Sequence, residues 1–154
     1  MSAKEYLSEI QKMKRRVDVL QRRMAELRTQ VEGIKAITYD TDRVQASAEN
    51  RLEINMLKLV DCEHRYITAV ANLHSSIQIR ERQIGKLDNP VFVELLCMRY
   101  IDGFSLKRIA EELHQSHPDK NYGEDYIRHL HGWALQAFEK KYPEKCKNIT
   151  QGHI

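Results

Sequence analysis

Histidine is the residue type in this sequence best suited to chemistry, because its ring can bind a metal ion or transfer a proton near neutral pH. Four histidines lie near one another in the last third of the chain: His114, His117, His129 and His131. Their spacings are irregular and no cysteine lies at ligand spacing, whereas structural zinc sites combine four regularly spaced ligands. We therefore expect no metal site.

Sequence motifs of catalysis are absent as well. The chain has no Gly-rich phosphate loop, no GxSxG and no HExxH, the patterns that position phosphates, nucleophiles or zinc. We expect no catalytic residue, no cofactor and no enzyme activity. The three widely spaced cysteines, and the lack of a long apolar run or a signal-peptide core, predict a cytoplasmic protein without a membrane segment.

The elements that must carry any functional residues are helical. The first proline is Pro90, so long helices can precede it. Apolar residues at alternating spacings of three and four predict a coiled-coil seam in the first helix: Ile10, Met13, Val17, Leu20, Met24, Leu27, Val31 and Ile34. A second seam runs from about Glu49 to Leu87 and is interrupted by Glu63 and Arg80.

The link between these helices, residues 36–48, carries several residues that favour turns and caps. Two long helices with a short link fold readily as an antiparallel hairpin, which we favour here. A continuous parallel coiled coil is the alternative, but its flanking residues include only one attractive pair. Because hairpins can also pair with each other, we expect a homodimer through residues 1–88.

A trihelical domain is expected over residues 89–142, followed by a polar tail, 143–154. Pro90 suits the first turn of a helix, and the three helices are expected at 91–101, 106–114 and 124–141. Gly103 suits a turn with positive φ, and Ser105 suits the N-cap of the second helix. The expected fold class is therefore all-α, a long helical hairpin followed by a helix-turn-helix domain.

The core of the trihelical domain is expected to consist of its apolar residues. These are Leu95, Leu96, Met98, Tyr100, Ile101, Phe104, Ile109, Ala110, Leu113, Ile127, Leu130, Ala134, Leu135 and Phe138. Ala110 is expected where two helices approach closely, because a larger side chain would overpack there. Trp133 is interpreted as a further packing residue.

The stretch LLCMRYIDGFSLKRIAEEL, continued by DYIRHLHGWALQAF, resembles region 4 of bacterial sigma-70 factors. It is more similar still to the sigma-like, RinA/ArpU-type regulators of late transcription in phages of low-GC Gram-positive bacteria. DRVQASAENRLE also resembles a short signature between the two long helices of such proteins. The resemblance implies a phage or prophage protein that binds double-stranded DNA in the bacterial cytoplasm.

In that family the third helix enters the major groove. The resemblance places Glu124, Asp125, Arg128 and His129 at the positions that face base edges. An arginine can pair with guanine through two hydrogen bonds, and a carboxylate can accept from the amine of cytosine. Alternatively, the four residues are solvent-exposed helix positions that make no contact with bases.

Three further basic residues are expected to contact phosphates, namely Lys107, Arg108 and Lys120. Lys120 lies in HQSHPDKNYG, which is longer than the tight turn of the family and has Gly123 where a serine cap is expected. Glycine is an acceptable cap. The effect of the longer loop, 115–123, on the angle between the second and third helices stays open.

The sequence is compatible with three functions. The first is a DNA-binding activator of phage late genes that works with bacterial RNA polymerase. The second is an adaptor with a helix-turn-helix fold that does not bind DNA, because residues 90–154 hold nine basic and nine acidic side chains. The third is a subunit like a small terminase, which we disfavour because those proteins carry the DNA-binding fold before the oligomerising helices.

Overall fold

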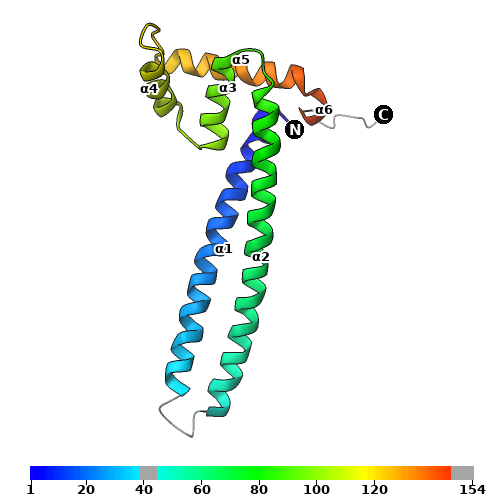
Figure 1. Cartoon of the computed structure of the whole chain (residues 1–154), viewed down its shortest axis with the longest axis vertical. Helices are drawn as coiled ribbons and strands as arrows, with labels where there is room; N and C mark the ends of the chain where they lie inside the picture. Colours follow the sequence, from blue (N-terminus) through cyan, green and yellow to red (C-terminus); the bar gives the residue numbers. More distant parts are fainter. Residues whose placement is uncertain (39–44, 147–154) are drawn as a thin grey trace, which may run out of the picture. The chain divides into compact units, whose positions relative to one another are not determined.

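The computed structural model describes residues 1–38 and 45–146, and all regular structure in them is helical (Figure 1). The two long helices are α1, Ala3–Thr38, and α2, Gln45–Gly85. They are followed by α3 (Pro90–Leu96), the π-helical turn η1 (Cys97–Ile101), α4 (Leu106–Ser116), α5 (Glu124–Lys141) and α6 (Pro143–Cys146). The predicted all-α fold is confirmed. Residues 39–44 of the expected link and 147–154 of the expected tail lie outside the described residues.

The chain forms two compact units whose borders cut through the long helices. Unit 1 combines Met1–Lys12 with the chain from Ser75 onward, and unit 2 is Met13–His74. The expected border at residues 88–90 thus marks the change from α2 to α3 but no border between compact units. The physical reason is that the first turns of α1 and the last turns of α2 share buried contacts with the short helices.

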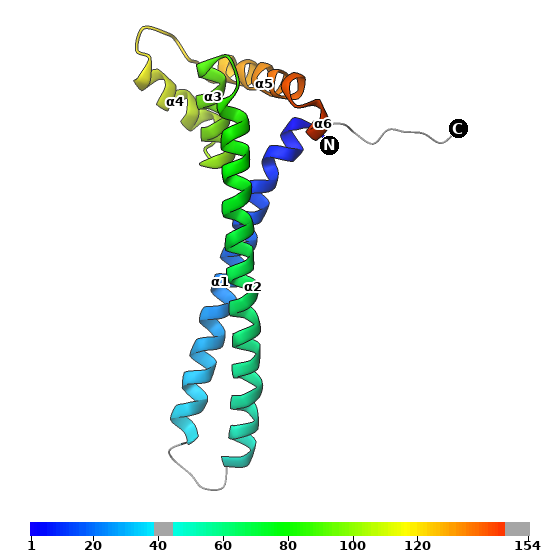
Figure 2. The ribbon, with the colours of Figure 1, turned by 45° about the vertical axis from the view of Figure 1, so that its right-hand side comes forward.

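Unit 2 is an antiparallel helical hairpin, in which α1 and α2 run side by side in both views (Figures 1 and 2). Its buried cluster contains Met24, Leu27 and Cys62, against which Leu20, Leu59 and Tyr66 pack. The thiol of Cys62 donates a weak hydrogen bond to the carbonyl oxygen of Leu20 at 3.7 Å. The middle of the expected seam of α1, at Leu20, Met24 and Leu27, therefore faces α2 of the same chain.

Unit 1 has a core built from the start of α1, the end of α2 and the short helices. Ala3, Leu7 and Ile10 of α1 are fully buried, as is Ile84 of α2. Most residues of the expected trihelical core are also buried: Leu95, Leu96, Tyr100, Ile101, Ile109, Ala110, Leu113, Ile127, Leu130, Ala134 and Phe138. Met98, Phe104 and Leu135 are only partly buried.

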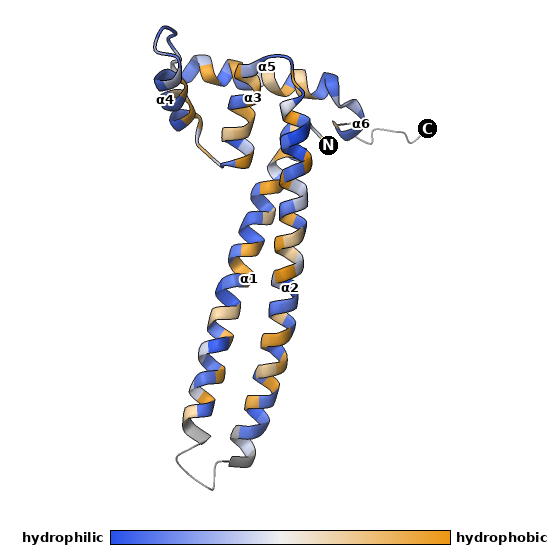
Figure 3. Ribbon diagram, viewed as in Figure 1, coloured by the Kyte–Doolittle hydropathy of each residue, from blue (hydrophilic) through white to orange (hydrophobic). Residues whose placement is uncertain are grey.

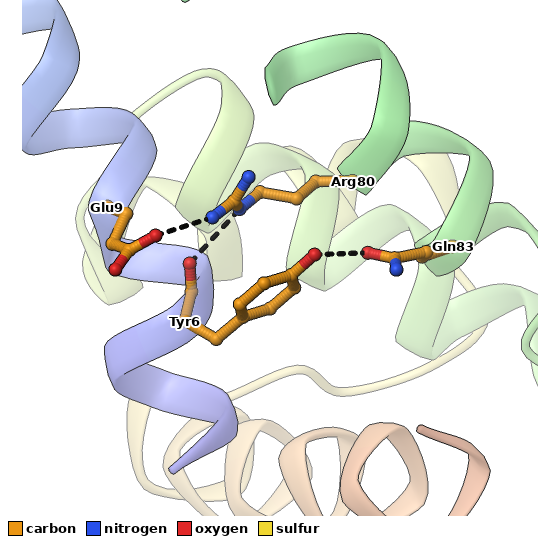
Figure 4. A network of polar contacts seen from close by, with 4 residues as sticks. All are labelled: Tyr6, Glu9, Arg80 and Gln83. Carbon is orange, nitrogen blue, oxygen red and sulfur yellow. Dashed lines mark hydrogen bonds and ion pairs between the residues drawn. The ribbon is translucent and has the colours of Figure 1, made fainter. Parts of the chain in front are cut away.

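Polar contacts tie the start of α1 to the end of α2 within unit 1 (Figure 4). Arg80 is buried, its Nε donates to the carbonyl oxygen of Tyr6 at 3.0 Å, and its guanidinium lies 4.1 Å from the centre of the Tyr6 ring. The same guanidinium donates to Glu9 at 2.7 Å, and the hydroxyl of Tyr6 donates to Gln83 at 2.9 Å. Arg80, a break in the heptad pattern, is therefore the centre of a polar network.

The turn between η1 and α4 follows the expected chemistry. Gly103 has φ of +78°, which a residue with a Cβ adopts at a cost. The hydroxyl of Ser105 accepts a hydrogen bond from the backbone N–H of Arg108 at 3.2 Å, which caps α4. Gln11 of α1 packs against this turn and donates to the carbonyl oxygen of Tyr100 at 2.9 Å.

The first residues of the expected polar tail form a short helix, α6. Pro143 occupies its first position, where a missing N–H costs nothing, and Tyr142 before it donates from its hydroxyl to the carbonyl oxygen of Gln83 at 3.0 Å. The C-terminal part of α5 is thereby attached to the end of α2. None of the described helices combines the length and the apolar character required to cross a membrane.

Candidate nucleic-acid interface

The surface expected to bind DNA is the first two turns of α5. The helix begins at Glu124, as predicted, with Gly123 as its N-cap and without a side chain that caps it. Ile127 and Leu130 are buried on one side, which leaves Glu124, Asp125 and Arg128 on the surface. The buried positions thus determine which face of α5 is free to meet a ligand.

Three of the predicted base-facing residues form one cluster. Arg128 lies 3.1 Å from the carboxylate of Glu124 and 3.9 Å from that of Asp125, and its side chain is 62% exposed. The two carboxylates also lie at the N-terminal end of α5, where the helix dipole stabilises negative charge. The cluster is therefore built as a local ion-pair network on an open face.

His129, the fourth predicted base-facing residue, has a different neighbour. Its ring lies 6.2 Å from the ring of Trp133, with an angle of 32° between the planes. The side chain is exposed, but it belongs to the aromatic row described below and has no described contact with Arg128. The structure therefore separates His129 from the ion-pair cluster.

The predicted phosphate contacts lie on other elements. Lys107 and Arg108 are exposed in the first turn of α4, where the guanidinium of Arg108 lies 3.7 Å from the centre of the Phe104 ring and 3.9 Å from Glu112. Lys120 is exposed in the loop before α5 and lines a hollow of about 450 Å³. All three ammonium or guanidinium groups can therefore reach a ligand in solvent, but the structure does not join them to the α5 cluster.

The long loop before α5 is packed onto the domain. Tyr122 is buried, and its ring lies 6.0 Å from the ring of His117. The backbone N–H of Lys120 donates to the carbonyl oxygen of His117 at 3.1 Å, which closes a turn inside the loop. α4 and α5 remain in contact with each other despite the added residues.

An aromatic row was not predicted from the sequence; it contains Tyr122 of the preceding loop and Tyr126, His129 and Trp133 of α5. Tyr122, Tyr126 and Trp133 follow each other with ring centres 6.0 and 6.4 Å apart. Trp133 is 50% exposed, so its interpretation as a packing residue was wrong. Tyr126, His129 and Trp133 recur at spacings of three and four residues along α5, and they are other positions than the buried Ile127 and Leu130. This helical spacing is the signal that could have revealed the row.

His131 is a partly buried histidine of α5 that contacts a tyrosine of η1. Its Nε2 lies 2.9 Å from the hydroxyl of Tyr100, and the two rings stack at 5.7 Å. Burial lowers the pKa of His131, and the positive charges of Arg99 and Lys4 lower it further. Burial also raises the pKa of Tyr100 to about 12. Burial therefore favours the neutral form of His131, which shares a hydrogen bond with the hydroxyl of Tyr100.

No protein-family model matches the chain, and no curated protein and no solved structure is significantly similar to it. Among the described residues, no three His, Cys, Asp or Glu side chains come close enough together to hold a metal ion. The exposed side chains of α4 and α5 form the candidate site.

Proposed function

We propose that this protein is a DNA-binding transcription regulator of the phage type, in which α4 and α5 form the helix-turn-helix. The observation that carries the proposal is the open face of α5, a helix that packs against α4 and leaves the Arg128 side chain 62% exposed. A helix presented in this way can enter the major groove with its N-terminal residues toward the bases.

The ion pairs of Arg128 do not prevent such binding. An exposed ion pair contributes about 0–1 kcal/mol, whereas a bidentate arginine–guanine contact discriminates by about 1–3 kcal/mol. The guanidinium can therefore leave Glu124 for a guanine at a net gain. Glu124 and Asp125 are then available to accept from cytosine amines, or to reject phosphates that approach in a wrong register.

The remaining parts of the proposal concern position and partners. Lys107, Arg108 and Lys120 neutralise phosphates on either side of the reading helix. The protein acts as a homodimer through its long helices, in the cytoplasm of a bacterial host, and contacts RNA polymerase to activate late genes. The resemblance to sigma region 4 supports the polymerase and late-gene parts.

The direct test is selection of binding sites from a random pool of duplex DNA, followed by mobility shifts on the enriched sequence. We expect Arg128→Ala to weaken binding to that site about 5- to 150-fold, as a loss of about 1–3 kcal/mol implies. Arg23→Ala is the matched control, because Arg23 is 63% exposed and lies 3.9 Å from Glu26, three residues after it. Failure to enrich any sequence, or an equal loss in both variants, would contradict the proposal.

A second candidate is an adaptor that binds protein and no DNA. Two observations favour it: Arg128 is partly neutralised by its carboxylate neighbours, and Tyr126 and Trp133 expose 45% and 50% of their surface, as aromatic residues of protein interfaces often do. Retention on immobilised DNA separates the candidates, because phosphate contacts release counterions and make binding fall steeply with salt. Ring-sized oligomers in light scattering would instead support the third function, that of a subunit like a small terminase.

A further inference from the structure

A row of large apolar side chains lies on the surface of α2 inside unit 2. Leu57, Val60 and Ile67 are 65%, 62% and 64% exposed, and Met56 and Val70 are exposed as well. We call these five residues the α2 stripe. Soluble chains rarely leave several large aliphatic side chains together in water, and such a patch usually marks an interaction surface.

The α2 stripe has the spacing of a second coiled-coil seam. Leu57 and Val60 are three residues apart and Ile67 follows seven residues after Val60, as in a heptad pattern. Leu59, Cys62 and Tyr66 form the side of α2 that packs against α1. Leu57, Val60 and Ile67 lie on another side of the helix, and Val70, four residues after Tyr66, lies at the edge between the two sides. Apolar residues accordingly recur along much of α2 (Figure 3).

One end of the stripe is hollowed and the other end carries branched side chains. Leu52, Met56, Leu57 and Val60 line a shallow hollow of about 420 Å³, with Glu49 and Glu53 also on its wall. Ile67 and Val70 at the other end have the shape that fills a hollow of this kind. A surface that carries both halves of a contact can be closed by a two-fold axis, because each half then meets its counterpart on a second copy.

We propose that the α2 stripe is a homodimer interface in which the α2 helices of two copies pair in antiparallel orientation. Leu57 of each copy then lies opposite Ile67 of the other, and Met56 lies beside Val70 of the other. This inference specifies the homodimer named in the proposed function. Both tests below measure the association of the chain with itself and contain no DNA. Their failure can therefore be distinguished from a failure of DNA binding.

The charges along the stripe favour the antiparallel orientation over the parallel one. In a parallel pair, Glu53 would face its own copy in the seam, and like charges placed against each other oppose association. In the antiparallel pair Glu53 lies near His74 of the second copy, which offers a hydrogen-bond donor.

The two carboxylates nearest the two-fold axis already have partners within their own chain. Asp61 lies 3.1 Å from Arg65, and Glu63 lies 3.1 Å from Arg28. Their negative charges are therefore compensated where the two helices approach each other. The central part of the antiparallel pair does not bring two uncompensated carboxylates together.

The first test is the oligomeric state of the full chain by sedimentation equilibrium. We expect the wild type to be a dimer, Leu57→Glu to be a monomer and Val19→Glu to stay a dimer. Val19 is the matched control, because it is an apolar residue of unit 2 that is 54% exposed but lies on α1, outside the stripe. Circular dichroism checks that the variants keep the helicity of the wild type. A monomeric wild type, a dimeric Leu57→Glu, or dissociation by Val19→Glu would overturn the proposal.

The second test determines the orientation by disulfide cross-linking. The three native cysteines are first replaced by alanine, and Leu57→Cys and Ile67→Cys are then made in separate chains. We expect the mixture of the two variants to form a cross-linked dimer on oxidation and neither variant to cross-link alone. In the antiparallel pair like positions lie about 15 Å apart at 1.5 Å per residue, far beyond the reach of a disulfide. Cross-linking of each variant with itself, or none in the mixture, would refute the antiparallel pairing.

Discussion

Arg80 of α2 holds Glu9 of α1 at 2.7 Å while its own side chain is only 6% exposed, against 34% for Glu9. A cation removed from water is costly unless it is paired and hydrogen-bonded. Arg80 meets this condition through Glu9, the carbonyl oxygen of Tyr6 and the face of the Tyr6 ring. The arginine that breaks the apolar seam therefore fixes how the ends of the two long helices are joined within unit 1.

Loss of one partner of this pair should cost more than loss of both. We expect Glu9→Ala to lower the free energy of unfolding by about 2–4 kcal/mol, because it leaves a buried charge without its counter-ion. Arg80→Met combined with Glu9→Ala should lose less than Glu9→Ala alone, since methionine fills similar volume without a charge. Urea denaturation of the wild type and the variants provides the comparison. A double variant less stable than Glu9→Ala would show that the uncompensated charge is not the cause.

Two glycines should respond to alanine with opposite signs. Gly103 has φ of +78°, and a Cβ there would lie 3.0 Å from the side-chain oxygen of Gln11, so Gly103→Ala should destabilise by about 1–2 kcal/mol. Gly132 lies inside α5, and an added Cβ would meet only open space there, so Gly132→Ala should stabilise by about 0.4–1 kcal/mol. Thermal unfolding of both variants tests the pair. If both substitutions changed stability in the same direction, backbone conformation would not be the dominant effect at these positions.

Much of the fold could be predicted because local patterns determine it. The helix start at Glu124, the positive φ of Gly103 and the cap by Ser105 are encoded within a few residues of each position. The compact units could not be predicted in this way. They depend on contacts between residues far apart in sequence, such as the backbone N–H of Ala3 with the carboxylate of Glu139 at 2.9 Å.

A substitution at Ala110 tests whether two helices approach each other closely in the trihelical core. Ala110 is buried on α4, and the extra volume of a leucine must displace neighbours in a dense interior. We expect Ala110→Leu to lower the free energy of unfolding by about 1–3 kcal/mol. Glu111→Leu is the neighbouring control: Glu111 is exposed, and surface changes usually stay within about 0.5 kcal/mol. If Ala110→Leu unfolded at the same urea concentration as the wild type, the close contact between helices would lie elsewhere.

The candidate site was predictable only in part. Burial of Ile127 and Leu130 follows from helical periodicity, so the open face of Arg128 follows as well. The pairing of Arg128 with Glu124 follows from their four-residue spacing. The exposure of Trp133 does not follow from the sequence pattern. A tryptophan on a helix is expected to bury its large apolar surface unless neighbouring elements leave that side open.

His131 should make stability depend on pH. Burial, followed by the charges of Arg99 and Lys4, lowers its pKa below the ordinary value of 6.5. Below pH 6.5 the unfolded chain therefore binds a proton that the folded chain still refuses, so this histidine lowers stability as the pH falls and has no such effect above that pH. Protonation also leaves the ring with N–H donors only, which restricts how Nε2 can bond to the hydroxyl of Tyr100 at 2.9 Å.

We therefore expect the free energy of unfolding to fall less between about pH 7.5 and pH 5.5 in His131→Gln than in the wild type. Glutamine keeps a hydrogen-bond acceptor for Tyr100 but does not titrate. His114→Gln is the control for the loss of a histidine as such, because His114 is exposed on α4. Urea denaturation at the two pH values measures all three proteins. If His131→Gln keeps the full pH dependence of the wild type, the histidine is not the group that couples protonation to unfolding.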